Sequence, residues 1–191
     1  MQFELESRNT LIPASKTSIN LLYVIAGTLL LAISAKIQIP FFPVPLTMQT
    51  FVVLLIGFAF GWRLGGLTVL AYLAEGAAGL PVFAGTPEKG IGIAYMAGPT
   101  GGYLLGFLAA AVVTGFLAEK RWDRTWLGAA AAALIGLTVI YAFGLLWLGT
   151  VAGWDKPVLE WGLLPFLPGE ALKLFLLGAV LPLAWKFFPG K

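Results

Sequence analysis

The chain contains no cysteine and no histidine, and it is poor in charge. Without those two residue types it can form no disulfide, build none of the usual zinc or haem ligand sets, and pair no nucleophile with a histidine base. Charged residues make up 11% of its 191 residues and hydrophobic ones 59%, whereas a soluble domain carries about 25% charged residues. Because so little polar surface cannot coat a soluble globule, we expect an integral membrane protein.

Further absences narrow the function. The sequence has no GxxxxGK[ST] pattern, so we expect no phosphate site. We also expect no bound metal, because cysteine and histidine are absent, and no cofactor in this chain. The chain has a net charge of +3. In a membrane protein such an excess of positive charge mostly reflects basic residues in the cytoplasmic loops, so it does not indicate nucleic-acid binding. The first residues, MQFELESRNT, lack the basic region of a cleaved signal peptide, so we expect the first apolar run to remain as a span.

Six apolar runs approach the length that crosses about 30 Å of hydrocarbon as an α-helix. The second and third are short and are separated by the turn Gly61-Trp62-Arg63. Between the first and second, the prolines of IQIPFFPVP predict an extended segment. We therefore expect an all-α membrane protein with a single domain, residues 1–191, and spans at 19–35, 47–60, 64–78, 101–118, 126–151 and 168–187.

The basic residues orient these spans. An even number of spans puts both termini on one side, which then holds Arg8, Lys16, Arg63, Lys120, Arg121, Arg124, Lys186 and Lys191. The other side holds Lys36, Lys89 and Lys156. The positive-inside rule then predicts that both termini are cytoplasmic. The long loops 79–100 and 152–166, with segment 37–46, would lie outside, and we expect recognition on that face.

The last span holds two charges in an apolar stretch, LLPFLPGEALKLFLLGAVLPLAW. Glu170 and Lys173 are three residues apart, so on a helix they share a face and can pair. Pro168 suits the first turn, which places Glu170 where the helix dipole favours an anion. A charge inside a span costs at least about 2.5–3.5 kcal/mol, so such residues usually face a partner or a wet cavity. Alternatively, Glu170 lies at the interface and Lys173 snorkels up to it.

Other polar positions leave alternatives open. Glu75, near the outer end of the third span, is either an interfacial carboxylate, a polar wall of a ligand cavity or a partner for Lys173. Gln49 needs a hydrogen-bond partner, which is another helix or a ligand amide, while Thr47 suits a helix N-cap. Glycines repeat every four residues over 98–106, a spacing typical of close helix packing.

Aromatic and small residues supply the remaining candidates. Phe83, Tyr95 and Tyr103 could form the aromatic walls of a pocket, although each is also suited to packing alone. In the first span, Thr28 and Ala32 are small and four residues apart. Such a face admits another helix closely, from this chain or from a partner.

Four stretches, in this order, resemble one family. They are IPFFPVPLTMQT, AYLAEGAAGLPVFAG, GPTGGYLLGF and PFLPGEALKLFLLG. They are similar to the BioY proteins, the biotin-binding S-components of energy-coupling factor (ECF) transporters, and the resemblance extends over roughly residues 37–181, most of the chain. The match departs from the family where Glu170 replaces a common aspartate. A second departure lies in the first span, where members of the family often carry an AxxxA contact for the coupling subunit and this chain has Thr28-xxx-Ala32 as its nearest match.

The resemblance implies a six-helix membrane subunit with an outward-open pocket that captures biotin with high affinity. It implies partners, namely a transmembrane coupling subunit and two ATPase subunits that use ATP, and a prokaryotic plasma membrane as the location. Biotin carries a ureido ring, an apolar thioether ring with its chain, and a carboxylate. Glu170 can accept from the ureido N–H groups, Lys173 can donate to the ureido oxygen or to the carboxylate, and Gln49 can supply an amide contact. Phe83 and Tyr95 would form an apolar wall.

Two other functions remain to be weighed against binding. An ion-coupled secondary transporter could use Glu75, Glu170 and Lys173 as a proton relay, but the sequence has no inverted repeat or paired broken helices. An intramembrane enzyme would need an acid/base site with a nucleophile, and these three ionisable groups do not make one. We therefore expect a binding subunit and not an enzyme.

Overall fold

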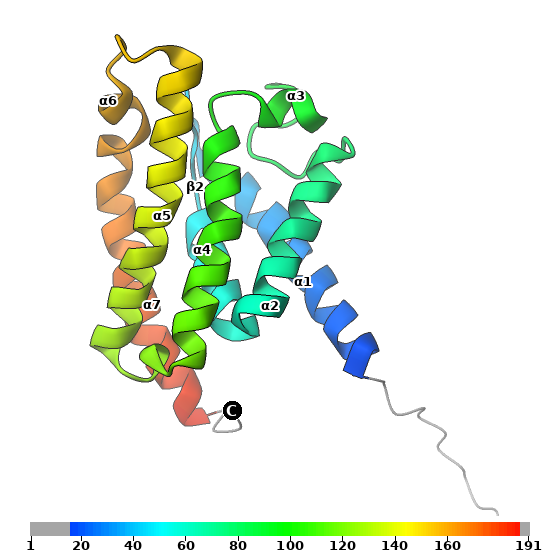
Figure 1. Cartoon of the computed structure of the whole chain (residues 1–191), viewed down its shortest axis with the longest axis vertical. Helices are drawn as coiled ribbons and strands as arrows, with labels where there is room; N and C mark the ends of the chain where they lie inside the picture. Colours follow the sequence, from blue (N-terminus) through cyan, green and yellow to red (C-terminus); the bar gives the residue numbers. More distant parts are fainter. Residues whose placement is uncertain (1–15, 188–191) are drawn as a thin grey trace, which may run out of the picture.

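The computed structural model describes residues 16–187 (Figure 1). Its elements are α1 (Lys16–Lys36), β1 (Gln38–Ile39), β2 (Leu46–Thr47), α2 (Gln49–Ala77), α3 (Gly92–Met96), α4 (Gly101–Glu119), η1 (Trp122–Arg124), α5 (Trp126–Ala152), α6 (Val158–Gly162), η2 (Leu164–Phe166) and α7 (Leu167–Phe187). Five stretches of this part of the chain are helical, long and apolar enough to cross a membrane. The expected all-α membrane fold is confirmed.

The second long helix is broken where the sequence predicts a turn. Gly61, inside α2, has φ 76° and ψ 175°, a backbone conformation that glycine adopts without the penalty of a side chain. In Figure 1 the first half of α2 descends to this point and the second half rises from it. The two short spans expected at 47–60 and 64–78 are therefore the two arms of one broken helix, and counting them separately gives six helices.

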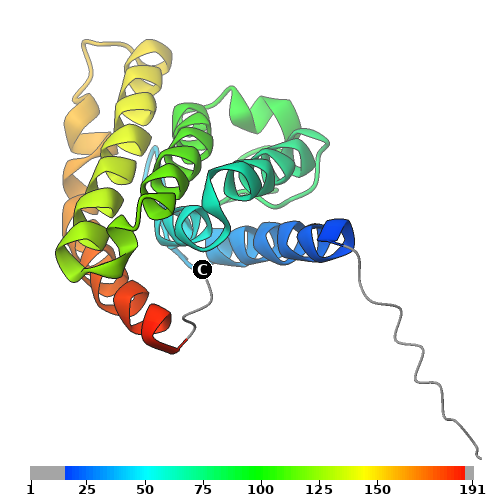
Figure 2. The ribbon, with the colours of Figure 1, turned by 60° about the horizontal axis from the view of Figure 1, so that its bottom comes forward.

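The first helix lies along one side of the bundle, against α2 (Figure 2). Its small residues face inward: Gly27 packs against Thr68 of α2, and Thr28 is 4% exposed with its hydroxyl donating to the carbonyl of Ile25 at 3.1 Å. Ala32 is partly buried against the core. Gly27, beside them, packs on α2 of the same chain, and the expected contact of Thr28 and Ala32 with a partner subunit stays a prediction. Large apolar side chains cover the exposed side of α1: Ile19, Leu21, Leu22, Tyr23, Ile25, Leu29, Leu30 and Ile33.

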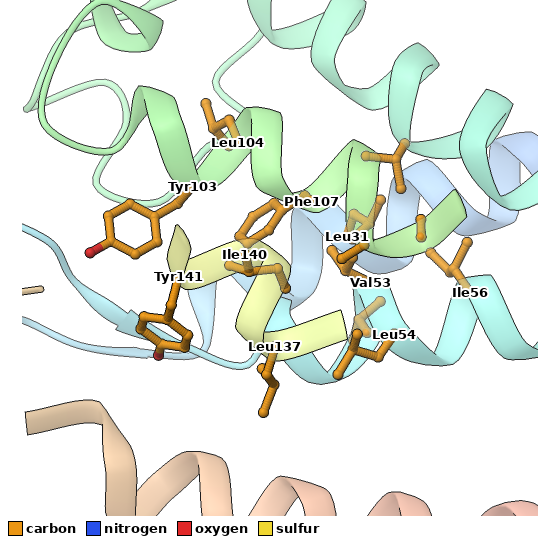
Figure 3. Close-up of a cluster of buried hydrophobic side chains, with 14 of the residues drawn as sticks. Leu31, Val53, Leu54, Ile56, Tyr103, Leu104, Phe107, Leu137, Ile140 and Tyr141 are labelled. Carbon is orange, nitrogen blue, oxygen red and sulfur yellow. The ribbon is translucent and has the colours of Figure 1, made fainter. Parts of the chain in front are cut away.

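The α4–α5 interface is close because a glycine lies at its centre. A Cβ atom at Gly106 would lie 2.8 Å from the Cα of Ile140 and 2.9 Å from its carbonyl oxygen. This contact matches the packing role expected for the glycines of 98–106. Figure 3 shows the apolar cluster around it, with Tyr103 and Tyr141 at one end. Their rings meet edge to face with centroids 5.9 Å apart.

The two ends of the bundle differ in which chain segments and how many basic residues they carry. The start of α1 and the end of α7 lie at the bottom of Figure 1, and α3 and α6 lie at the top. The shared end of α1 and α7 agrees with an even number of crossings. The basic residues lie at the same end: Arg63 just after the break of α2, Lys120, Arg121 and Arg124 in the α4–α5 turn, and Lys186 in the last turn of α7. Arg8 and Lys191, also used to orient the chain, lie outside the described residues.

The segments expected to face outside contain short elements that apolar runs do not reveal. The proline-rich segment 37–46 is extended, as expected, and its ends form a two-residue antiparallel pair in which Gln38 is opposite Thr47. The loop after α2 contains α3, and the loop after α5 contains α6 and η2. These connections hold the first turns of α2, α4 and α7 near one another, and a cavity forms there.

Candidate ligand-binding site

A cavity of about 450 Å³, counted with its mouth, lies where the first turns of α2, α4 and α7 meet. Its wall consists of the polar residues Thr47, Gln49, Thr50, Thr100 and Glu170, the tyrosines Tyr95, Tyr103 and Tyr141, and the apolar residues Val44, Pro45, Ala84, Leu104, Phe107 and Phe166. A mostly apolar wall with a few convergent polar groups is typical of a site for a small molecule.

Glu170 forms the charged centre of this wall. It is 5% exposed and accepts hydrogen bonds from the Thr50 hydroxyl at 2.9 and 3.0 Å and from the Tyr141 hydroxyl at 3.2 Å. The Lys173 ammonium donates to its Oε1 at 2.9 Å. A buried carboxylate is tolerated only when it is paired and its remaining lone pairs are satisfied. This carboxylate points into the bundle, toward α2 and α5, and not along the membrane interface.

Lys173 lies behind Glu170, outside the cavity wall. Besides Glu170, its ammonium donates to the backbone carbonyl of Thr47 at 2.7 Å and to the Thr50 hydroxyl at 2.8 Å. These three contacts use all three donors of an ammonium group. Lys173 and Glu170 also line a neighbouring open hollow between α7 and the segment from Ile37 to Met48, of about 760 Å³ when its open mouth is counted. In this arrangement Lys173 positions Glu170 and Thr50, which line the cavity, and does not line the cavity itself.

Gln49 is held by a residue that the sequence patterns did not indicate. Its amide Nε2 donates to the Tyr72 hydroxyl at 2.7 Å, and that hydroxyl donates to the carbonyl of Val82 at 2.9 Å. Tyr72 is fully buried and Gln49 is 3% exposed. The hydrogen-bond partner that Gln49 requires thus lies on the second arm of α2. These two hydrogen bonds fix the orientation of the Gln49 side chain in the cavity wall.

The predicted aromatic residues occupy two layers. Tyr95 and Tyr103 line the cavity, and the Tyr103 hydroxyl donates to the carbonyl of Gly162 at 2.8 Å. Phe83 is fully buried behind them and stacks on Tyr95 with ring centroids 5.2 Å apart. Burial raises the pKa of Tyr95 above its ordinary value, so this phenol stays protonated at neutral pH. Phe83 therefore supports the wall and does not form it.

Glu75 is not part of the cavity wall. It lies on α2, one turn beyond Tyr72, and is half-buried. The ion pair of Lys173 is with Glu170, and the cavity lining does not include Glu75. Of the alternatives, its place near the outer end of α2 fits a carboxylate outside the site.

Thr50, Tyr72 and Tyr141 are polar residues of the long helices at the site that the sequence patterns did not indicate; Thr100, in the connection before α4, is another. The first three lie within long apolar helices, where a buried hydroxyl needs a hydrogen-bond partner. That requirement was a usable signal for Tyr72 and Tyr141, although it does not identify the partner. Thr50 lies 120 residues from Glu170 in the chain, and nothing local predicts that contact.

The fold and the site together define a membrane protein built to bind a small solute. The described residues form five long apolar helical stretches, and α2, α4, α5 and α7 contribute to the wall of a cavity whose polar groups hold one another in place. The chain belongs to the BioY family, because the model of that family matches residues 7–190.

Relatives and a solved structure agree with this family. The biotin transporter BioY of Thermotoga maritima is 42% identical over 147 residues, which are 77% of this chain and 84% of the relative. The BioY of Rhizobium etli, also named a biotin transporter, is 35% identical over 84% of this chain and 90% of the relative. The S-component for biotin from an ECF-type ABC transporter matches this fold with a TM-score of 0.74 and 28% identity. That match covers 89% of this chain and 92% of the other.

Proposed function

We propose that this chain captures biotin in the outward-facing cavity and serves as the biotin-binding subunit of an ECF-type uptake system. The observation that carries the proposal is the buried Glu170, held by Thr50, Tyr141 and Lys173 in the wall of a mostly apolar cavity. The proposal is supported by the relatives, which are named biotin transporters, and by the matching solved structure, which is the S-component for biotin of an ECF-type ABC transporter.

The cavity offers the kinds of groups that biotin would need, namely hydrogen-bonding groups for its ureido ring and apolar surface for its thioether ring and chain. Among the described contacts, Oε2 of Glu170 accepts a bond from Thr50 alone, so it retains lone pairs for a ureido N–H. A charge-assisted bond in a largely dry site is of the strong kind. Phe107, Leu104 and Phe166 offer apolar surface to the thioether ring and its chain. Gln49, fixed by Tyr72, presents its amide to the same space.

The proposal requires other subunits. The chain has no nucleotide-binding pattern, so ATP-driven uptake needs a transmembrane coupling subunit and two ATPase subunits. The cell membrane of a prokaryote is the location that fits such an assembly. The exposed apolar row of α1 is one surface of the bundle that lipid or a coupling subunit could cover.

Calorimetry on the purified chain in detergent tests the proposal directly. We expect biotin to bind with nanomolar affinity, desthiobiotin more weakly, and thiamine not at all, because the vitamins differ in the groups that Glu170 and the apolar wall recognise. A folded protein that binds no biotin would contradict the proposal. Circular dichroism of the same sample distinguishes that outcome from unfolding.

Reconstitution separates the proposed function from ion-coupled transport. The chain alone in proteoliposomes should bind biotin without concentrating it. Accumulation by the chain alone, abolished by a protonophore, would instead favour a secondary transporter with Glu170 and Lys173 in a proton relay. Uptake that requires added ATP and the coupling subunits would support the proposal.

The Tyr72→Phe variant tests the support of Gln49. Removing the hydroxyl leaves the Gln49 amide and the Val82 carbonyl without their present partner, so we expect biotin affinity to fall by about 0.5–1.5 kcal/mol, the net value of a hydrogen bond. Tyr23→Phe is the matched control, because that ring is half exposed on α1. Equal affinity in both variants, measured by calorimetry, would remove Tyr72 from the site.

A further inference from the structure

The last residue of α1 is bonded to a loop far from it in sequence. The Lys36 ammonium donates to the backbone carbonyls of Phe83 and Thr86, each at 3.0 Å, and to the Thr86 hydroxyl at 3.1 Å. That hydroxyl donates in turn to the Phe83 carbonyl at 2.6 Å. All three ammonium donors are used on one short stretch of chain, and Thr86 is buried.

This stretch belongs to the connection between α2 and α3, residues 78–91, which we call the wall loop. Phe83 and Thr86 flank Ala84, which is 3% exposed and lines the ligand cavity. Lys36 therefore holds the backbone on both sides of the segment that forms the wall. Since Lys36 itself is exposed, its charge remains partly hydrated and needs no carboxylate partner.

The wall loop is fixed at other points by groups without charge. The Tyr72 hydroxyl holds the Val82 carbonyl, and the Phe83 ring packs edge to face on Tyr72 and stacks on Tyr95. Tyr95 also lines the cavity. Lys36 supplies the only contacts from α1 to the wall loop that carry a charge, within residues 16–187.

We propose that Lys36 is a positioning residue that keeps the wall loop closed on the bound ligand and so sets the rate of ligand release. The inference rests on the proposed function for the identity of the ligand, but the anchoring itself does not. It also gives α1 a mechanical link to the site: α1 packs chiefly on α2, and any movement of its outer end acts on the wall loop through Lys36.

The test compares Lys36→Met, Lys36→Arg and Thr86→Val with Lys156→Met in the full-length protein. Lys156 is the matched control, because it is a half-exposed lysine on another loop and pairs only with the exposed Asp155, at 3.2 Å. Hydrogen exchange of the ligand-free protein reports the anchoring, with the Lys89 amide, bonded to the Gly85 carbonyl at 2.8 Å, as a probe. Release of labelled biotin into excess unlabelled biotin reports the effect on the ligand.

For Lys36→Met we expect faster exchange in the wall loop and biotin release about tenfold faster, the factor that corresponds to 1.4 kcal/mol, with a nearly unchanged association rate. Thr86→Val, which removes one acceptor and keeps the shape, should give a smaller change in the same direction. Lys36→Arg should restore slow release, because a guanidinium can donate to the same carbonyls.

Three results would overturn the proposal. They are unchanged release in Lys36→Met and Thr86→Val, equal acceleration in Lys156→Met, and faster loop exchange with no change in release, which would leave Lys36 a structural role alone. If the parent protein binds no biotin, the proposed function fails by itself, and exchange in the ligand-free variants still decides whether Lys36 anchors the loop.

Discussion

Replacing Glu170 with glutamine is expected to weaken biotin binding by about 1–3 kcal/mol, the range for losing a buried hydrogen bond to a charged group. Glutamine keeps the size of the side chain and one acceptor oxygen, but it removes the negative charge that a ureido N–H would meet. It also leaves the Lys173 ammonium, now paired at 2.9 Å, without a counter-charge in a largely buried position. Binding and stability should therefore both fall, and calorimetry with thermal unfolding measures the two.

A second substitution separates these two effects. In the double variant Glu170→Gln with Lys173→Met no unpaired charge remains, so stability should recover in part, because replacing a whole buried ion pair costs less than breaking it. Biotin affinity should stay low, since the carboxylate is still absent. Glu160→Gln, at an exposed position on α6, is the control and should match the parent. Full biotin affinity in Glu170→Gln would place the ligand elsewhere.

The sequence predicts the helices of this protein well because lipid imposes one local rule on each. A run of apolar residues near the membrane thickness must form a helix, whatever its neighbours are. The predicted spans 126–151 and 168–187 thus differ from α5 and α7 by one residue at an end. The pair Glu170 and Lys173 was also readable, because a spacing of three residues on a helix is local geometry.

The contacts across the bundle could not be read in the same way. The carboxylate of Glu170 meets Thr50 and Tyr141, which lie 120 and 29 residues away in the chain. Such contacts depend on how helices rotate about their axes, and helices that are apolar on every side carry little periodic signal of that rotation. For the same reason the sequence left open whether the face of Thr28 meets a helix of this chain or of a partner, since the exposed side of α1 is as apolar as its buried side.

Glycine at position 106 is expected to matter for stability as much as Glu170 matters for binding. In Gly106→Ala the new Cβ would lie 2.8 Å from the Ile140 Cα and 2.9 Å from its carbonyl oxygen, and backbone atoms cannot move aside as a flexible side chain can. We expect the free energy of unfolding to fall by about 1–3 kcal/mol, the usual cost of overpacking a well-packed core. Thermal unfolding in detergent measures this change.

The same substitution elsewhere should have the opposite sign, which makes the test sharp. A Cβ at Gly169, near the start of α7, meets no atom within 4 Å, so Gly169→Ala should leave stability equal or raise it by about 0.5–1 kcal/mol, the gain of alanine over glycine in a helix. Gly106→Ala should also weaken biotin binding, because it separates the helices that carry Tyr103 and Tyr141 into the cavity wall. If Gly106→Ala proved as stable as Gly169→Ala, the close α4–α5 approach could not be what fixes the spacing of those two tyrosines.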